Sequence, residues 1–172
     1  MMTPSWRKAV LTAHIACSVG WTGAVAAFLA LAVAGIAAPD FQMTRAAYRA
    51  MDLITWWVIV PAALASLFTG LVSSLGTGWG LLRYYWVVVK LLMTVLSTTI
   101  LVVHLQPIER LAIAAVAGNA YGAALSQAQL MMVIASGAAV FALLVLTGLS
   151  VYKPRGLTPY GARKQGTPPA SH

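Results

Sequence analysis

The chain has 172 residues, of which 60% are hydrophobic and only 8% charged, whereas a soluble domain of this size carries about a quarter charged residues. This composition excludes a water-soluble enzyme and predicts a membrane protein. The excess of 11 Lys and Arg over 3 Asp and Glu does not indicate nucleic-acid binding, because these charges lie at the ends of apolar segments. The single cysteine, Cys17, excludes a disulfide within the chain and a multi-thiolate metal site.

Four apolar segments are each long enough to cross a hydrocarbon core of about 30 Å. Backbone groups in that core have to be satisfied internally, so the segments are expected to be helices. We therefore expect an all-α, polytopic four-helix transmembrane domain over residues 1–152. The predicted spans cover about residues 9–37, 53–75, 85–105 and 130–152.

The segments between the predicted spans are interpreted as linkers over residues 38–52, 76–84 and 106–129. In the third linker, Pro107 favours the first turn of a short interfacial helix. Pro61, inside the second span, is expected only to bend its helix.

Positive charge predicts the orientation of the bundle, because Lys and Arg gather on the cytoplasmic side of membrane proteins. Both termini are therefore expected to be cytoplasmic, in a multi-pass protein of a bacterial cytoplasmic membrane. The basic tail over residues 153–172, rich in Pro and Gly, is expected to be disordered or bound to a surface. The side predicted to be cytoplasmic holds Arg7, Lys8, Arg83, Lys153, Arg155, Arg163 and Lys164, and the opposite side holds only Arg45, Arg49 and Arg110.

The expected partners follow from this charge distribution. The cytoplasmic collar of Lys and Arg is predicted to contact anionic lipid headgroups. A membrane protein partner and a homo-oligomer both stay open, and no nucleic-acid partner is expected.

Ionisable residues inside a span cost at least ~2 to 3 kcal/mol unless they are paired or hydrated, so each is a candidate functional residue. His14 and Lys90 each lie about five residues after the start of an outward-running span, or roughly 7 to 8 Å inside the membrane. The two residues are therefore expected to lie at the same depth in the membrane. His104 lies about 21 Å farther across, so His14 and His104 cannot ligate one metal ion or one haem.

Each of these residues has an alternative structural explanation. His14 could donate to a backbone carbonyl of a neighbouring helix instead of ligating a cofactor. Lys90 could extend its long side chain to the membrane interface, and His104 could be an interfacial histidine.

Helical periodicity places the candidates on two stripes that are expected to face the bundle interior. The methionines Met131 and Met132 lie at about the depth of His104, where a thioether could be an axial ligand, although adjacent methionines commonly fill a core or face lipid. The first stripe holds His14, Cys17, Ser18, Trp21, Val25 and Phe28, and the second holds Lys90, Thr94, Ser97, Leu101 and His104.

The run HIACSVGWTG, which contains His14, Trp21 and Gly23, and the run WVVVKLLMTVL, which contains Lys90, together resemble a loose superfamily of small bacterial membrane proteins. The superfamily includes copper-resistance D-type domains, HemJ-type membrane protoporphyrinogen oxidases and a predicted integral-membrane family without an assigned function. The resemblance to the last of these is the strongest. HemJ-type proteins are understood as b-type haem proteins that depend on a first-helix histidine and a third-helix lysine.

By this resemblance, b-type haem is the expected cofactor and His14 its axial ligand, with Trp21 beside it. Lys90 would be either a neutral second ligand or a cation that pairs with a haem propionate. His104 would mark a second possible metal position, at a different depth in the membrane. The expected function is membrane redox chemistry with bound haem, and whether the chain is an enzyme stays open. The alternative is a non-catalytic membrane subunit or scaffold without a cofactor.

Overall fold

The computed structural model describes residues 3–76, 84–116, 123–152, 156, 158, 159 and 163; side chains of residues 102, 104–116 and 123–126 lie outside this description. All the secondary-structure elements in the described part are helical. They are α1 (Pro4–Ala37), α2 (Phe41–Ile54), the π-helical turn η1 (Thr55–Ile59), α3 (Val60–Gly76), α4 (Tyr85–Val116) and α5 (Ala123–Tyr152).

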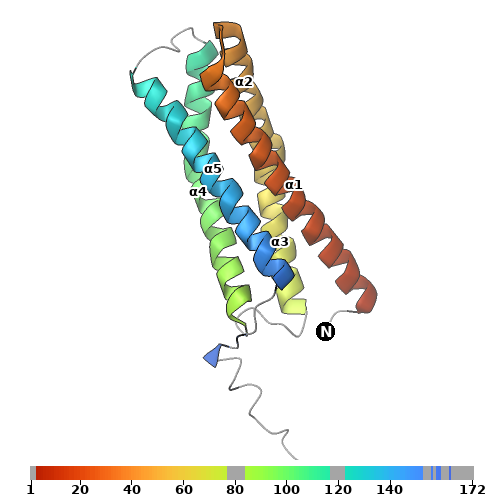
Figure 1. The fold of residues 1–172 in the computed structure, drawn as a ribbon. Coiled ribbons are helices and arrows are strands. Elements are labelled where there is room, and N and C mark those ends of the chain that lie inside the picture. Colours follow the sequence, from red (N-terminus) through yellow and green to blue (C-terminus); the bar gives the residue numbers. More distant parts are fainter. Residues whose placement is uncertain are drawn as a thin grey trace, which may run out of the picture.

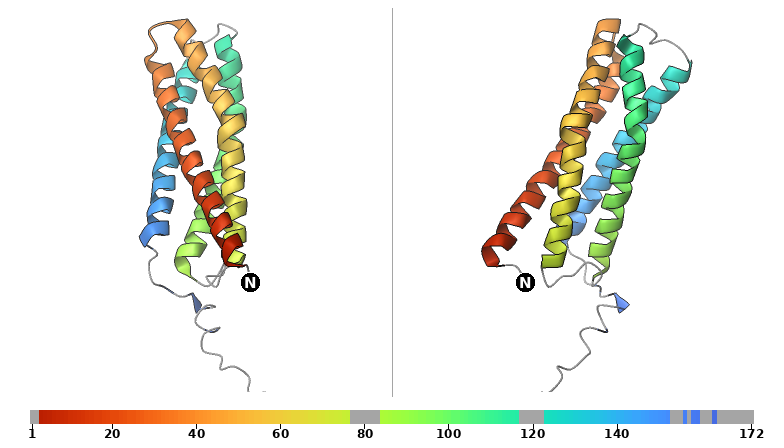
Figure 2. Two further views of the ribbon diagram at one scale, coloured as in Figure 1. Left: turned by 90° about the vertical axis from the view of Figure 1, so that its right-hand side faces the viewer. Right: turned by 180° about the vertical axis from the view of Figure 1, so that it is seen from behind.

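The helices form an up-and-down bundle in which α2, η1 and α3 make one continuous rod (Figure 1). Three helical segments are long and apolar enough to cross a membrane, namely Pro4–Ala37, Phe41–Gly76 and Gln127–Tyr152, and the described apolar part of α4 is Tyr85–Leu101. The expected all-α membrane bundle is thus confirmed in its helical architecture. The beginning of α1 and the end of α5 lie at the same end of the bundle (Figure 2).

Contacts between the helices show which of them are neighbours. Helix α1 packs against α2, η1, α3 and α5, while α4 packs against α2, α3 and α5. Helices α1 and α4 therefore lie diagonally opposite each other in the described bundle (Figures 1 and 2). Residues from α1 and α4 can share a site only by facing the centre of the bundle.

The segment over residues 38–52, which was predicted to lie between two spans, is mostly helical and forms α2. Asp40 caps the helix: its side chain accepts a hydrogen bond from the backbone N–H of Met43 at 2.7 Å. Ala47, Tyr48 and Met51 recur at helical spacing and are buried. The helix is amphipathic and its apolar side packs against α1, which stabilises it outside the predicted span.

The boundaries of the last two spans also differ from those predicted. Helix α4 continues to Val116 through Pro107, so the predicted short helix that starts at Pro107 is instead an extension of α4. Helix α5 begins at Ala123, several residues before the predicted start at residue 130. Both helices are longer than the roughly 20 residues that a bilayer requires.

A π-helical turn precedes Pro61 in the second rod. The N–H of Val60 bonds to the carbonyl of Thr55, one residue farther back than in an α-helix, and the hydroxyl of Thr55 donates to the carbonyl of Met51 at 2.7 Å. A proline clashes with the carbonyl four residues before it, and a wider turn accommodates that clash. Pro61 therefore lies in a continuous helix, with the irregular hydrogen bonding in the turn before it.

The core lies along the inward faces of the helices, as the stripe pattern predicts. Small residues on α1 allow its neighbours to approach closely. Gly35 lies directly against the ring of Tyr48, and a Cβ atom built on Gly35 would be 3.2 Å from Cζ of that ring. The remaining interior is filled by large apolar side chains. The buried residues of the cluster are Trp21, Ala24, Val25, Phe28, Ala32, Tyr48, Met51, Ile59, Ala63, Met132, Leu143 and Leu146.

The predicted tail over residues 153–172 lies mostly outside the described residues. Two of its described residues touch the bundle: the carbonyl of Gly156 accepts a hydrogen bond from the N–H of Tyr85 at 3.2 Å, and Thr158 is buried. The described start of the tail is thus attached to the beginning of α4.

Candidate functional site

His14 lies on the inward face of α1 and hydrogen-bonds to α3. Its Nδ1 atom is 3.1 Å from the carbonyl oxygen of Ser66 and 3.1 Å from the hydroxyl oxygen of Thr69. The side chain is half-buried. An imidazole otherwise isolated in a span is thereby anchored to a neighbouring helix.

These two contacts determine which ring nitrogen carries the proton. The carbonyl of Ser66 can only accept, and the hydroxyl of Thr69 already donates to the carbonyl of Ala65 at 2.6 Å, so it too accepts from the ring. Nδ1 is therefore the protonated nitrogen, shared between two acceptors. In the neutral ring, Nε2 keeps its lone pair and is free to bind a metal or accept a proton.

The close approach of the His14 ring to α3 requires a glycine at position 70. A Cβ atom on Gly70 would lie 3.0 Å from Cε1 of His14 and 3.4 Å from Nδ1. This contact is tighter than nine in ten real Cβ contacts, so the ring would have to shift by a few tenths of an ångström. Gly70 therefore positions the imidazole on α3.

A second polar contact joins the same two helices one turn deeper. The hydroxyl groups of Ser18 and Ser66 lie 2.8 Å apart, and Ser66 is buried. His14 and Ser18, which are four residues apart, thus both meet the Ser66 turn of α3. This part of the α1–α3 interface is polar.

Lys90 lies on α4, and its ammonium group hydrogen-bonds to α5. Nζ donates to the hydroxyl oxygen of Ser150 at 2.6 Å, and that hydroxyl donates to the carbonyl of Leu146 at 2.7 Å. The side chain is half-buried. Lys90 is therefore held between α4 and α5 by a donor contact.

His14 on α1 hydrogen-bonds to α3, whereas Lys90 on α4 hydrogen-bonds to α5. The two predicted residues thus come from diagonally opposite helices, and each is held by a different neighbouring helix.

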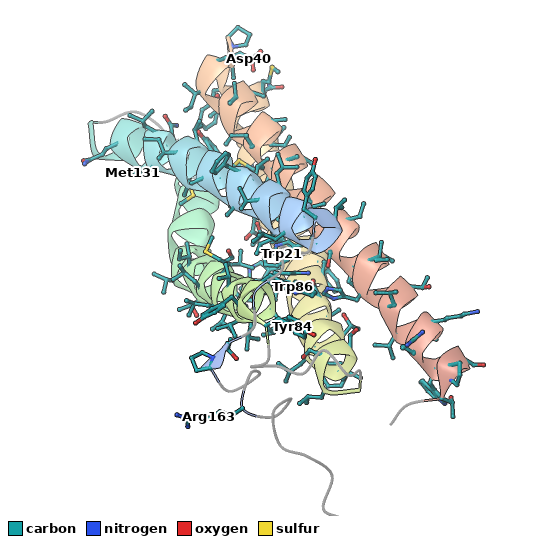
Figure 3. The ribbon with its side chains drawn as sticks, turned by 60° about the horizontal axis from the view of Figure 1, so that its bottom comes forward. Trp21, Asp40, Tyr84, Trp86, Met131 and Arg163 are labelled. Atoms are coloured by element: carbon teal, nitrogen blue, oxygen red, sulfur yellow. The ribbon has the colours of Figure 1, made fainter. Side chains whose placement is uncertain are left out.

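The other predicted residues have different surroundings. Trp21 is only 3% exposed and belongs to the apolar core, where Figure 3 shows it among the helices. His104 lies on α4, but its side chain is outside the described residues. Met132 is buried in the core, whereas Met131 on the outer side of α5 is 52% exposed (Figure 3). The two methionines thus point in different directions, as consecutive residues on a helix do.

The hydrogen bond of Nδ1 leaves Nε2 as the atom of His14 that could ligate a metal. A ligating histidine commonly donates its other ring N–H to a backbone carbonyl, and Nδ1 of His14 does so to Ser66. No group of three or more His, Cys, Asp or Glu side chains that could hold a metal ion occurs among the described residues. A group that brings its own ligands, as a porphyrin does, needs only one or two side chains from the protein.

Residues 66, 69 and 70 on α3, and Ser150 on α5, were not predicted from the sequence to belong to this site. Each is small, and small residues in a span ordinarily indicate close helix packing. The sequence does place them three or four residues apart on one face of α3, which is the spacing that a shared partner requires. Their contact with His14 depends on how α1 crosses α3.

Comparisons of the chain with family models, curated proteins and solved structures gave no match.

Proposed function

We propose that this bundle binds one b-type haem through Nε2 of His14 and takes part in electron transfer in a bacterial cytoplasmic membrane. The hydrogen bond from Nδ1 of His14 to the carbonyl of Ser66 carries this proposal, because it orients the ring and leaves Nε2 as the ligating atom. The resemblance to HemJ-type proteins at His14 and Lys90 agrees with the same assignment.

The position of Lys90 favours the propionate-pairing role over axial ligation. Its Nζ already donates to Ser150 at 2.6 Å and needs no change of protonation to pair with a carboxylate, whereas an iron ligand would have to lose a proton. A lysine inside the bundle suits a cofactor that carries carboxylates, because its ammonium group can pair with them. Haem bound here would supply one-electron chemistry, and the chain would hold and orient it.

The test is an absorption spectrum of the detergent-purified full chain, oxidised and then reduced with dithionite, together with a pyridine haemochrome count. We expect a Soret band and a stoichiometry of about one haem per chain, set by the single His14 ligand. His14→Ala should remove the band, and imidazole added to that variant should restore part of it. His104→Ala is the matched control and should keep the spectrum.

A colourless protein, even when haem is supplied during expression, contradicts this proposal. So does a Soret band that survives in His14→Ala. If His14→Ala and His104→Ala lose haem to the same extent, the assignment of His14 as the axial ligand is contradicted.

A second candidate function is a membrane scaffold or subunit without a cofactor. The observation that favours it is that His14, Ser18 and Lys90 each already bond to a neighbouring helix, which is what residues that specify helix packing do. In this case His14→Ala lowers the free energy of unfolding of the bundle by about 1 kcal/mol, and no chromophore is present before or after the change. The spectrum and the unfolding temperature together separate the two functions.

A further inference from the structure

An open cavity of about 400 Å³ lies on the second helical rod, away from His14 and Lys90. It is lined by Asp52, Leu53, Trp56 and Trp57. These residues come from the last turn of α2 and from η1. The π-helical turn changes the register of side chains along the rod, and such turns are frequent at functional sites.

The sequence around this cavity places it at a membrane interface. Asp52 is the last charged residue before an uncharged stretch over residues 53–76, which is long enough to cross the hydrocarbon core. Trp56 and Trp57 follow one turn later and are 49% and 78% exposed. Exposed tryptophans at the end of an apolar stretch are typical of the headgroup level of a bilayer.

The chemistry of the lining indicates a cation. Asp52 is half-buried, and its carboxylate forms no ion pair or side-chain hydrogen bond within the part of the chain that the structure describes. Two indole rings lie beside it, and the face of an indole attracts a positive charge. One carboxylate and two aromatic rings in one cavity are complementary to an ammonium group.

We propose that this cavity binds the headgroup of an aminophospholipid, with the primary ammonium group on Asp52 and against Trp56 or Trp57. A lipid is the occupant because the neighbouring surface is apolar: Leu53 is 59% exposed and Val58 is 43% exposed, and both would contact acyl chains. Arg49, three residues before Asp52 on α2, is exposed and would supply a positive charge for the lipid phosphate. The site does not depend on whether haem binds at His14.

The experiment is native mass spectrometry of the full chain in detergent with equal amounts of phosphatidylethanolamine, phosphatidylcholine and phosphatidylglycerol that carry the same acyl chains. We expect the first bound lipid to be phosphatidylethanolamine, at least about fivefold over phosphatidylglycerol, because a carboxylate attracts the ammonium group and repels a net anion. The amount of bound phosphatidylcholine should lie between those of the other two lipids, since its quaternary ammonium is a cation that cannot donate a hydrogen bond.

Three variants give the proposal its controls. Asp52→Asn should reduce the preference for phosphatidylethanolamine over phosphatidylglycerol to less than about twofold, because it removes the charge from the cavity. Trp57→Leu should weaken binding of phosphatidylethanolamine and phosphatidylcholine, the two lipids that carry an ammonium group, and it provides a second test if Asp52→Asn misfolds. Asp40→Asn removes the same charge from the same helix but retains a capping acceptor, so it should keep the preference.

Equal binding of the three lipids to the unaltered chain overturns the proposal. So does a preference for phosphatidylethanolamine that survives both Asp52→Asn and Trp57→Leu, or one that Asp40→Asn abolishes equally. A protein that occupies the cavity through a basic side chain and excludes lipid from it would also overturn the assignment.

Discussion

Nδ1 of His14 and the carbonyl oxygen of Ser66 lie 3.1 Å apart, on two helices that are adjacent in space and 52 positions apart in sequence. This contact combines the two interpretations that the sequence left open for His14. A histidine that donates to a backbone carbonyl stabilises helix packing, and the same bond leaves Nε2 oriented as a ligand. The structural role and the proposed cofactor role therefore differ only in what, if anything, binds Nε2.

Gly70→Ala should displace the His14 ring from α3, because the added Cβ would lie 3.0 Å from Cε1. We expect a loss of unfolding free energy of about 1 to 3 kcal/mol, as is usual when a methyl group is forced into a packed interface. Thermal unfolding in detergent measures the change. If haem binds at His14, its content should fall in parallel.

The matched control for this substitution is Gly20→Ala, because a Cβ at Gly20 has no atom within 4 Å among the described residues. It should leave stability unchanged or raise it slightly, since alanine favours a helix. Equal destabilisation by the two substitutions would rule out a positioning role for Gly70.

Thr69→Val should weaken the anchor of His14 while nearly conserving side-chain volume. The hydroxyl of Thr69 is one of two acceptors for Nδ1, so its removal leaves the carbonyl of Ser66 in place. We expect a cost of about 1 kcal/mol, measured as a fall in unfolding temperature. His14→Ala combined with Thr69→Val should cost less than the sum of the two single changes, because the residues share one interaction. Strict additivity would contradict the assigned contact.

Lys90→Leu, which removes the amine without adding another iron ligand, should separate the two roles that the sequence left open for this residue. If Lys90 pairs with a propionate, haem affinity should fall by about five- to tenfold and the spin state should stay the same, because an ion pair adds roughly 1 kcal/mol. If Lys90 is an axial ligand, the spin state should change. Haem titration and electron paramagnetic resonance measure the two effects, and Ser150→Ala is the control that removes only the hydroxyl partner of Nζ.

Tyr48→Phe should leave the bundle as stable as before or slightly more stable. The hydroxyl of Tyr48 is buried and meets no partner in strict hydrogen-bond geometry, with the Gln129 side chain as its one weak contact among the described residues, so its removal deletes a poorly satisfied polar group. Gly35→Ala at the same contact should instead cost about 1 to 3 kcal/mol, because the new Cβ would lie 3.2 Å from the ring. A large loss of stability in Tyr48→Phe would show that its hydroxyl has a partner in the membrane.

Asp40→Ala should loosen the start of α2, because the carboxylate of Asp40 accepts from the N–H of Met43 at 2.7 Å. Loss of such a cap costs about 1 kcal/mol. Hydrogen exchange should therefore become faster in the first turn of α2 and remain unchanged in α3. Asp40→Asn should behave like the unaltered chain, since an asparagine also caps a helix.

Several features of the fold could be predicted from the sequence because they depend only on local composition. A run of apolar residues without charges has to cross the membrane as a helix, so the helical bundle follows from hydropathy. The inward stripe of α1 also follows from spacing, and Trp21, Val25 and Phe28 on it are buried. Helix α2 was missed because its charged residues lower its hydropathy, although Asp40 and the spacing of Ala47, Tyr48 and Met51 indicate it.

Composition and spacing along the chain were thus enough to predict apolar helices, with His14 and Lys90 as ionisable residues inside them at comparable depth. What each residue contacts follows instead from helix packing: Ser66 and Thr69 for His14, and Ser150 for Lys90. The physical reason is that hydropathy and periodicity are properties of one helix. A hydrogen bond between helices depends on how they cross, and that depends on where small residues such as Gly70 and Gly35 allow close approach.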